Sequence, residues 1–209
     1  MIDSLHYISQ ATATHTHLEN IREACVAGCR WIQLRIKDAP EDIILAQAIA
    51  AKAICQQYGA VLIINDHPQV ALAAGADGVH VGKEDMTVAE ARAIVGDYLI
   101  VGGTANTLDD ILQHVTHGAD YVGVGPYRFT TTKQKLSPIL GLEGYMHLME
   151  ALRARHINIP VIAIGGILQE DIPALLDTGV HGVAVSGLIT HAADKASLLS
   201  MLQGTLARY

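Results

Sequence analysis

Gly75-Ala-Asp-Gly-Val-His-Val81 decides the fold, because the same pattern of residues returns further along the chain. Gly118-Ala-Asp-Tyr-Val-Gly-Val124 and Gly179-Val-His-Gly-Val-Ala-Val185 repeat it, and Gly28-Cys-Arg-Trp-Ile-Gln-Leu34 is a looser copy. The leading glycine accepts the left-handed conformation that ends a helix, and the apolar run after it is typical of a strand buried on both faces. The pattern therefore predicts a helix followed by a buried parallel strand, used repeatedly.

On both sides of these repeats, short apolar runs alternate with longer amphipathic stretches, which is typical of repeated βα units. The expected strands are Leu5–Ser9, Trp31–Arg35, Val61–Asn65, Gly78–Val81, Leu99–Gly103, Tyr121–Val124, Pro160–Ile164 and Gly182–Val185. The expected helices are Leu18–Ala27, Glu41–Tyr58, Pro68–Ala74, Val88–Val95, Leu108–His117, Glu143–Arg155, Glu170–Thr178 and Lys195–Ala207. Eight strands and eight helices are what a closed (β/α)8 TIM barrel requires. An open six-stranded sheet is the alternative, and it would leave two expected strands without a place.

The chain has the size of one domain. Its 209 residues are 50% hydrophobic and can bury one sizeable core, and the length lies at the lower end for a parallel barrel. No Ser-, Gly- or Pro-rich linker divides it. We therefore predict a single TIM-barrel catalytic domain over residues 1–209.

Charge and cysteine content narrow the class of function. The formal net charge is −7, from 14 Lys and Arg against 21 Asp and Glu, with no basic stripe for nucleic acid or an anionic membrane. The longest apolar runs, such as Val61–Ile64, are too short to span a bilayer, and the N-terminus lacks the features of a signal peptide. The sparse cysteines, Cys25, Cys29 and Cys55, are typical of a reduced cytoplasmic protein. We expect a cytoplasmic protein without a nucleic-acid or membrane partner.

Polar residues follow the second expected strand, where a barrel enzyme has its active site. In Gln33-Leu-Arg-Ile-Lys37, alternation predicts that Gln33, Arg35 and Lys37 point the same way. A cation at the upper end of a barrel is costly unless an anion meets it. Arg35 could pair internally with a carboxylate such as Asp66, but we favour binding of an anionic ligand.

Carboxylates follow the third and fourth expected strands. Asn65-Asp66 comes directly after an apolar run, and Asp85 lies a few residues after Val81. Mg²⁺ takes one or two carboxylates, keeps several waters and bridges to substrate phosphates. Asp66 alone could cap the next helix, but with Asp85 and the nearby cations it predicts a magnesium pyrophosphate site.

The longest insertion, Gly125–Gly141, follows the sixth expected strand. Its Thr130, Thr132 and Lys133 suit the binding of phosphate and closure over the site, although a solvated polar loop is the alternative.

A second anion site is expected at the last two strands. Gly165-Gly166 ends the seventh and Ser186-Gly187 the eighth, the loops that commonly hold phosphate through backbone N–H groups in such barrels. Two anion sites predict a transferase with a diphosphate leaving group, acting on two phosphorylated small molecules.

The ordered set of motifs resembles the thiamine phosphate synthase family, at matching spacing from about Gln33 to Ser186. The motifs are Gln33-Leu-Arg-Ile-Lys-Asp38, Ile64-Asn-Asp66, Gly75-Ala-Asp-Gly-Val-His-Val-Gly-Lys-Glu-Asp85, Gly118-Ala-Asp-Tyr-Val-Gly-Val-Gly-Pro126, Thr130-Thr-Thr-Lys133 and Ala163-Ile-Gly-Gly-Ile167. Any one of them is common among phosphate-binding barrels, whereas the ordered set is specific.

The resemblance implies a TIM barrel that couples 4-amino-2-methyl-5-hydroxymethylpyrimidine diphosphate to 4-methyl-5-(2-phosphoethyl)-thiazole and releases pyrophosphate. It further implies the following roles for residues of this chain. Asp66 and Asp85 bind Mg²⁺; Arg35, Lys37, Asn65 and Lys133 hold the pyrophosphate, with Arg35, Lys37 and Lys133 stabilising the leaving group; Gln33 faces the pyrimidine; Thr130, Thr132, Gly165 and Gly166 contact the thiazole phosphate; and Thr104, Ser186 and Gly187 complete the substrate contacts.

Several positions depart from the family pattern. His67 follows the Asp66 motif where Arg is frequent, and Thr104 with Asn106 replaces a Ser-x-His motif, so a hydroxyl is kept and a His is lost. Arg128 adds a cation beside the phosphate loop. Ser186 comes one position early, which favours a backbone contact there over a hydroxyl contact.

Two other functions remain as alternatives. A thiazole tautomerase-like relative would use a His just after the sixth strand's glycine, where this chain has Pro126. A non-catalytic barrel that binds thiamine precursors would not need the carboxylates and cations of a leaving-group site. The sequence leaves the oligomeric state open, including a homo-oligomer.

Overall fold

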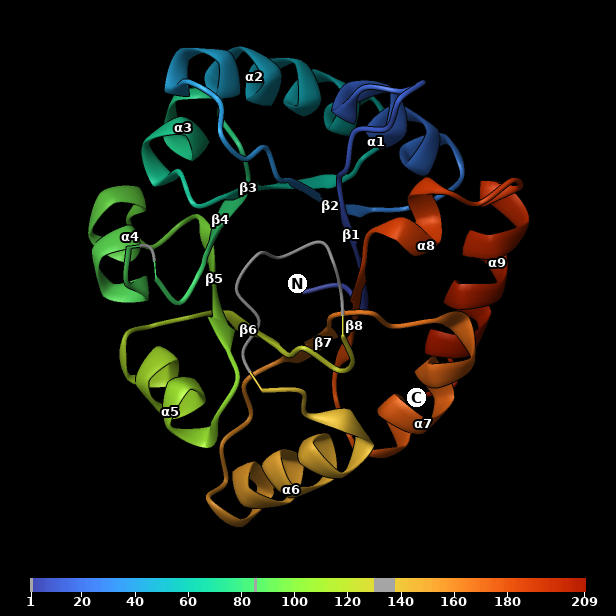
Figure 1. Cartoon of the computed structure of the whole chain (residues 1–209). Coiled ribbons are helices and arrows are strands. Elements are labelled where there is room, and N and C mark those ends of the chain that lie inside the picture. Colours follow the sequence, from blue (N-terminus) through green and yellow to red (C-terminus); the bar gives the residue numbers. More distant parts are fainter. Residues whose placement is uncertain (1, 85, 130–137) are drawn as a thin grey trace.

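Eight parallel strands close into a barrel in the order of the sequence (Figure 1). The computed structural model describes residues 2–84, 86–129 and 138–209. The strands are β1 Leu5–Ile8, β2 Trp31–Leu34, β3 Val61–Asn65, β4 Gly78–Val81, β5 Ile100–Ala105, β6 Tyr121–Val124, β7 Val161–Ile164 and β8 Gly182–Val185. Closure comes from β8 pairing with β1, with His6 opposite Ala184. The predicted (β/α)8 barrel is therefore confirmed, and the open six-stranded sheet is wrong.

Helices surround the barrel on its outside, as Figure 1 shows. They are α1 His17–Val26, α2 Glu41–Gln57, α3 Pro68–Ala73, α4 Val88–Val95, α5 Leu108–Thr116, α6 Gly141–Ala154, α7 Ile172–Asp177, α8 Gly187–Thr190 and α9 Lys195–Leu206. The helix expected over Glu170–Thr178 is divided into a 3₁₀ turn, η1 Gln169–Asp171, followed by α7. The short helix α8 was not expected, because four residues are too few to show a helical period.

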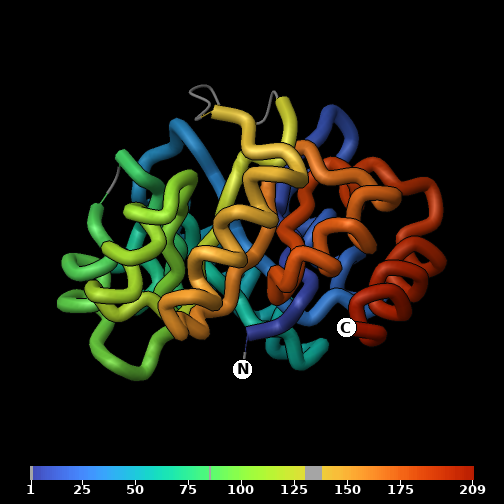
Figure 2. Tube along the Cα trace, turned by 90° about the horizontal axis from the view of Figure 1, so that it is seen from below, coloured from blue at the N-terminus to red at the C-terminus, as the bar shows by residue number. Residues whose placement is uncertain are grey.

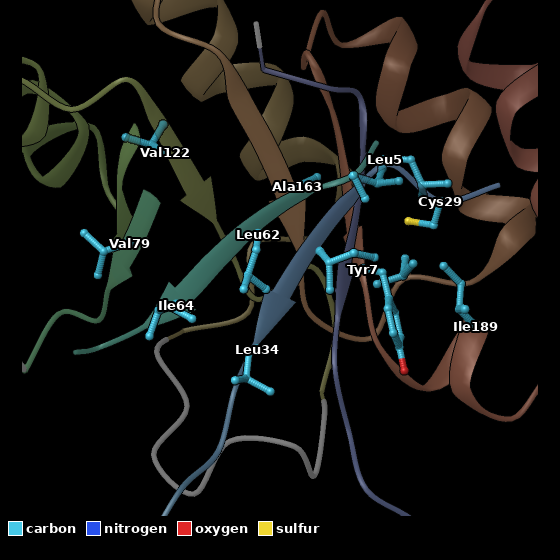
Figure 3. Packing of buried hydrophobic residues seen from close by; sticks show 14 of the residues in the cluster. Leu5, Tyr7, Cys29, Leu34, Leu62, Ile64, Val79, Val122, Ala163 and Ile189 are labelled. Atoms are coloured by element: carbon cyan, nitrogen blue, oxygen red, sulfur yellow. The ribbon is translucent and has the colours of Figure 1, made fainter. Parts of the chain in front are cut away.

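The main hydrophobic core lies between the strands and the helices. Leu34, Leu62, Ile64 and Val122 are fully buried there, together with apolar residues of the helices (Figure 3). A smaller second cluster fills the barrel itself, and its members come from alternate strand positions, namely Ile8, Trp31, Ile63, Tyr121, Ile162 and Ala184. Both faces of each strand are therefore covered, which explains why the strands read as continuous apolar runs.

Inside the barrel, side chains change from apolar to polar toward the carboxyl ends of the strands. Two residues after Trp31 comes the buried Gln33, and two residues after Ile63 comes the buried Asn65. Because successive side chains alternate between the faces of a strand, each pair lies on the same, inward face. The inward polar side chains thus gather at the end where barrel enzymes have their active sites.

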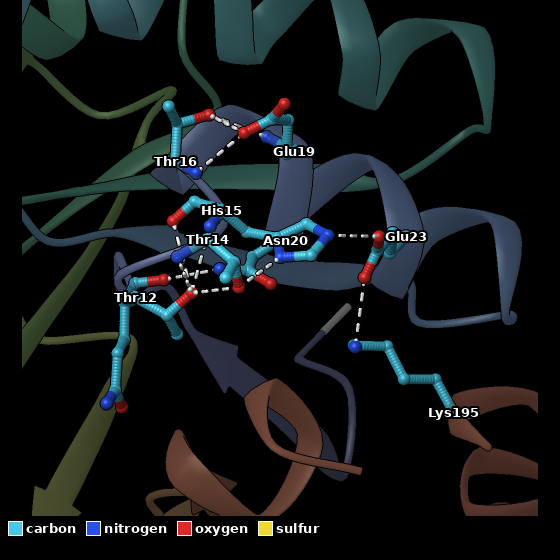
Figure 4. A network of polar contacts seen from close by, with 9 residues as sticks. Thr12, Thr14, His15, Thr16, Glu19, Asn20, Glu23 and Lys195 are labelled. Atoms are coloured by element: carbon cyan, nitrogen blue, oxygen red, sulfur yellow. Dashed lines mark hydrogen bonds and ion pairs between the residues drawn. The ribbon is translucent and has the colours of Figure 1, made fainter. Parts of the chain in front are cut away.

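The first βα loop is held at this same end by a network of polar contacts (Figure 4). Thr16 caps α1, since its hydroxyl accepts from the backbone N–H of Glu19 while Glu19 accepts from the backbone N–H of Thr16 at 2.7 Å. Glu23, one turn further, pairs with His15 at 3.3 Å and with Lys195 of α9 at 2.9 Å. The pair with Lys195 joins the first helix to the last.

The first described residues and the flanks of the β6–α6 connection lie at opposite ends of the barrel (Figure 2). Among the described residues, no helix combines the length and the apolar character that crossing a membrane would need.

Candidate functional site

Asp66 is the anionic centre of the site, and donors from Gly82, Asn65 and Lys37, all among the described residues, hold its carboxylate. Its Oδ1 accepts from the backbone N–H of Gly82 at 3.1 Å. Its Oδ2 accepts from the amide of Asn65 at 2.6 Å and pairs with the ammonium group of Lys37. The backbone of Asp66 adopts φ 63°, in the left-handed region that non-glycine residues rarely enter. Strain of this kind is frequent at functional sites, where surrounding contacts must hold it.

These contacts correct one alternative raised by the sequence. The N-cap residue of α3 is His67, just before the first helical residue Pro68, and its side chain makes no capping hydrogen bond. Asp66 reaches instead across to Gly82, just beyond β4. Asp66 is therefore not the helix cap, and its cationic partner is Lys37 rather than Arg35.

Arg35 lies directly after β2, beside two polar residues of the first βα connection. Its backbone N–H donates to the hydroxyl of Ser9 at 3.2 Å, and that hydroxyl shares a hydrogen bond of 2.8 Å with Nδ1 of His17. Burial, and then the charge of the Arg35 guanidinium, lower the pKa of His17. Within the part of the chain that the structure describes, no carboxylate pairs with this guanidinium. Its positive charge is available to an anionic ligand.

The three side chains expected to point the same way differ in their positions. Gln33 is buried inside the barrel, opposite Ile8 and Ile63 of the neighbouring strands. Because β2 ends at Leu34, the alternation does not continue to Lys37, which is exposed and reaches Asp66 from the loop. Lys37 and Asn65 therefore meet at the carboxylate of Asp66. Gln33 is buried near the end of β2, the strand that precedes the Lys37 loop.

Asn106 ties together the two flanks of the long connection after β6. Its buried amide donates to the carbonyl of Gly125 and to that of Pro138, both at 2.9 Å. The backbone N–H of Leu140 also donates to the carbonyl of Pro126, at 2.9 Å. An amide can donate both bonds at once, which explains how Asn serves at this position.

Gly165 and Gly166 lie under the start of the same connection. Both have positive φ, of 100° and 67°, and a Cβ on Gly165 would lie 2.7 Å from Pro126 Cα. A Cβ on Gly166 would lie 2.5 Å from Cγ of Arg128, whose guanidinium pairs with Asp171 at 2.7 Å. Arg128, which departs from the family pattern, thus has an ionic partner in η1. Contact with the Pro126 backbone at Gly165 and with the Arg128 side chain at Gly166 leaves no room for a larger residue at either glycine.

Ser186 and Gly187 lie where β8 passes into α8. The Ser186 hydroxyl donates to Gln10 Oε1 at 2.9 Å, and Gly187 is the first residue of the helix. Since the hydroxyl proton is already used within the protein, the backbone is the better donor for a ligand here.

Sequence reasoning missed several residues of this end of the barrel. Lys83 pairs with Asp110 at 2.8 Å, and Gln10 binds Ser186. His80 donates or accepts at Thr104, with its Nε2 2.9 Å from the Thr104 hydroxyl. The alternation of β4 was the signal for His80, because it places Gly78 and His80 on the same face and Val79 and Val81 on the other.

Four predicted site residues, Asp85, Thr130, Thr132 and Lys133, lie outside the described residues. Among the described ones, no group of three or more His, Cys, Asp or Glu side chains is placed to hold a metal ion.

A fixed carboxylate, the ammonium group paired with it and a guanidinium that has no acidic partner among the described residues all follow strands at the carboxyl end of a closed parallel barrel. This combination defines the class of protein, a (β/α)8 enzyme that binds phosphorylated small molecules.

Comparison with known proteins narrows the class. The chain matches the family described as Thiamine monophosphate synthase over residues 5–189. A thiamine-phosphate synthase of Phocaeicola vulgatus is 50% identical over 190 residues, 91% of each chain, and one of Flavobacterium psychrophilum is 46% identical over 99% of this chain and 100% of its own. A solved thiamine phosphate pyrophosphorylase from Pyrococcus furiosus has a TM-score of 0.85 at 32% identity, covering 98% of this chain and 96% of its own.

The chain belongs to the thiamine monophosphate synthase family. Its function is that of a thiamine-phosphate synthase, a transferase of thiamine biosynthesis.

Proposed function

We propose that this enzyme couples 4-amino-2-methyl-5-hydroxymethylpyrimidine diphosphate to 4-methyl-5-(2-phosphoethyl)-thiazole, giving thiamine phosphate and pyrophosphate. The observation that carries the proposal is the group around Asp66, where Lys37 and Asn65 meet the carboxylate and Arg35 has no acidic partner among the described residues. A diphosphate brings the negative charge that these cations require.

Lys37, Arg35 and Asn65 are the proposed contacts of the diphosphate, with Lys133 as a further cation. In the ligand-free chain, Lys37 neutralises Asp66. We infer that Lys37 moves to the diphosphate on binding, because its exposed side chain is free to change rotamer. The buried Gln33 stays in place and offers both a donor and an acceptor to the pyrimidine.

Asp66 fits a hard divalent cation. It presents carboxylate oxygens that are already fixed by Gly82 and Asn65, and the oxygen facing Lys37 is bound to a side chain that can leave. Asp66 and Asp85 would therefore hold Mg²⁺ together with the diphosphate. When bound, Mg²⁺ would neutralise charge on the leaving group.

The thiazole phosphate is proposed to bind at Gly165 and Gly166, with Thr130, Thr132 and the backbone of Ser186 and Gly187. Support comes from the positive φ angles of the two glycines, which bring bare backbone to the end of β7. Backbone N–H groups at such a point suit a phosphate monoester.

The chemistry proposed is dissociative. The bond between the pyrimidine methylene carbon and the diphosphate oxygen breaks first, and the thiazole nitrogen then donates its electron pair to that carbon. Arg35 and Lys37 stabilise charge on the departing diphosphate, and the amino-pyrimidine spreads the positive charge left on the methylene. No protein nucleophile is needed, so the contribution of the chain is positioning and electrostatic stabilisation.

The decisive experiment mixes the purified protein with both substrates and Mg²⁺ and measures pyrophosphate together with thiamine phosphate. Equal amounts of both products are expected. Isomerised thiazole would support the tautomerase-like alternative, and binding without any product would support the non-catalytic barrel.

The metal assignment is tested with Asp66→Asn and Asp85→Ala. We expect each to lower kcat roughly 100-fold or more at low Mg²⁺, by analogy with the loss of other electrostatic contacts to developing charge. Extra Mg²⁺ should restore part of the activity. Calorimetric binding of magnesium pyrophosphate, which needs no turnover, should weaken in parallel.

The matched control is Asp109→Asn, which removes an exposed carboxylate from the first turn of α5, at the same end of the barrel. It should behave as the unchanged protein does. If Asp66→Asn kept its kcat at low Mg²⁺, the metal assignment would be wrong.

A further inference from the structure

A chain of hydrogen-bonded side chains runs through the barrel interior to Thr104. The Tyr121 hydroxyl lies 3.0 Å from Nδ1 of His80, and Nε2 of the same ring lies 2.9 Å from the Thr104 hydroxyl. Tyr121 starts β6, His80 lies in β4 and Thr104 near the end of β5. The three side chains therefore form one path from the middle of the barrel to the carboxyl end of its strands.

Glycines on neighbouring strands make room for this path. A Cβ on Gly102 would lie 2.2 Å from Cζ of Tyr121, and one on Gly123 would lie 3.1 Å from Cε1 of His80. Trp31 packs edge-on against the Tyr121 ring, with centroids 5.0 Å apart. Both aromatic rings are buried and enclosed, so their orientation is fixed by packing.

The direction of the hydrogen bonds follows from the phenol. A phenol has one proton to donate, and Nδ1 of His80 is the acceptor that the structure gives it among the described residues. Burial raises the pKa of Tyr121, which keeps that proton in place. With Nδ1 as acceptor, Nε2 of the neutral ring carries the hydrogen and donates to the Thr104 hydroxyl.

We propose that Tyr121 and His80 are positioning residues that make Thr104 a hydrogen-bond donor to an acceptor atom of a bound substrate. Because Thr104 already accepts from His80, its own proton is directed away from that ring, toward the end of the barrel where the substrates are proposed to bind. The inference rests on the proposed function, in that Thr104 contacts substrate. It adds that Thr104 is the donor of the hydrogen bond to substrate, and that Tyr121 and His80 determine this direction.

A double-mutant cycle in kcat/KM tests the proposal, with Tyr121→Phe and Thr104→Val. Tyr121→Phe alone should lower kcat/KM by about 3- to 10-fold, the effect of one hydrogen bond. Thr104→Val should lower it by at least as much. The double variant should be no worse than Thr104→Val, because the phenol acts only through Thr104. Losses that multiply in the double variant would overturn the proposal.

Two further variants separate positioning from stability. Thr104→Ser keeps the hydroxyl, so adding Tyr121→Phe to it should again lower kcat/KM. Tyr7→Phe removes another buried phenol, whose hydroxyl bonds Thr190 at 2.8 Å on the outer side of the barrel. It should lower the melting temperature comparably and leave kcat/KM unchanged. An equal loss of kcat/KM in Tyr7→Phe would mean that the Tyr121 effect is structural.

A measurement without turnover keeps this inference separate from the proposed reaction. The ¹⁵N resonances of the His80 ring in the ligand-free protein report which nitrogen carries the proton. Protonation of Nε2 is expected, and the Nδ1–H tautomer would overturn the inference even if the reaction is as proposed. Conversely, absence of product with the Nε2–H tautomer present would count against the reaction alone.

Discussion

Gly102→Ala should be among the most destabilising single-methyl additions in this chain. The added Cβ would lie 2.2, 2.4 and 2.6 Å from Cζ, Cε1 and the hydroxyl oxygen of Tyr121. Contacts this short require the ring to move. The Tyr121 ring cannot swing aside, because Trp31 lies against it at 5.0 Å and His80 at 5.5 Å between ring centroids.

The cost is set by overpacking of a filled interior. Extra methyl groups in well-packed cores cost about 1–3 kcal/mol, and the enclosed ring puts Gly102→Ala at the upper end, about 3 kcal/mol. Urea unfolding followed by circular dichroism measures the change in the free energy of unfolding. In a Tyr121→Ala background, where the ring is absent, the added methyl group should cost less than 1 kcal/mol, roughly.

The matched control is Gly204→Ala, the same change on the exposed side of α9. Nothing lies within 4 Å of the added Cβ, and Ala is favoured over Gly in a helix interior by about 1 kcal/mol. Gly204→Ala should therefore stabilise the protein slightly. Unfolding of Gly102→Ala at the same urea concentration as this control, or an undiminished cost of the methyl group in the Tyr121→Ala background, would contradict the overpacking of the barrel interior.

Two other predictions concern the site and the interior. Asn106→Asp should lower the free energy of unfolding by about 2–3 kcal/mol, because a carboxylate cannot donate to the carbonyls of Gly125 and Pro138; unchanged urea unfolding would contradict the role of Asn106 in joining the two flanks. Burial lowers the pKa of His6 well below its usual 6.5, so the unfolded chain binds a proton below that pH and the folded chain does not. Stability should therefore be present above pH 6.5 and fall as the pH is lowered. His6→Phe, which keeps a ring stacked on Trp31, should reduce the change of the unfolding free energy with pH by up to about 1.4 kcal/mol per pH unit. If that pH dependence between pH 7 and 5 were unchanged in His6→Phe, His6 would not be responsible for it.

The strand and helix positions were predictable because they depend on local periodicity. Val61–Asn65, Gly78–Val81, Tyr121–Val124 and Gly182–Val185 are strands with the expected bounds. Turn-forming glycines such as Gly75, with φ 62°, end their helices as the repeat suggests. The exceptions are short or distorted elements, namely α8 and the 3₁₀ turn before α7, where fewer than two helical turns carry no periodic signal.

The candidate site was predictable only as a set of residue types at strand ends. Parallel strands bring their carboxyl ends together, so Arg35, Asn65 and Asp66 had to lie at one end of the barrel once the fold was known. Which cation meets which carboxylate depends on side-chain reach and backbone torsion. Lys37 takes Asp66 because β2 ends at Leu34 and because Asp66 adopts a positive φ, neither of which follows from spacing.

The sequence by itself therefore determined the alternation of strands and helices, the closed barrel and the end at which chemistry occurs, because hydrophobic period and glycine turns are local properties. The tertiary structure alone decided what His80 does. Its motif repeats elsewhere as scaffold. In the barrel, Thr104 of the neighbouring strand β5 meets one nitrogen of the ring, and the curvature of the sheet brings Tyr121 of β6, two strands away, to the other. Contacts between strands far apart in the chain depend on how enclosed side chains share one interior volume, and no local pattern of residues encodes that division.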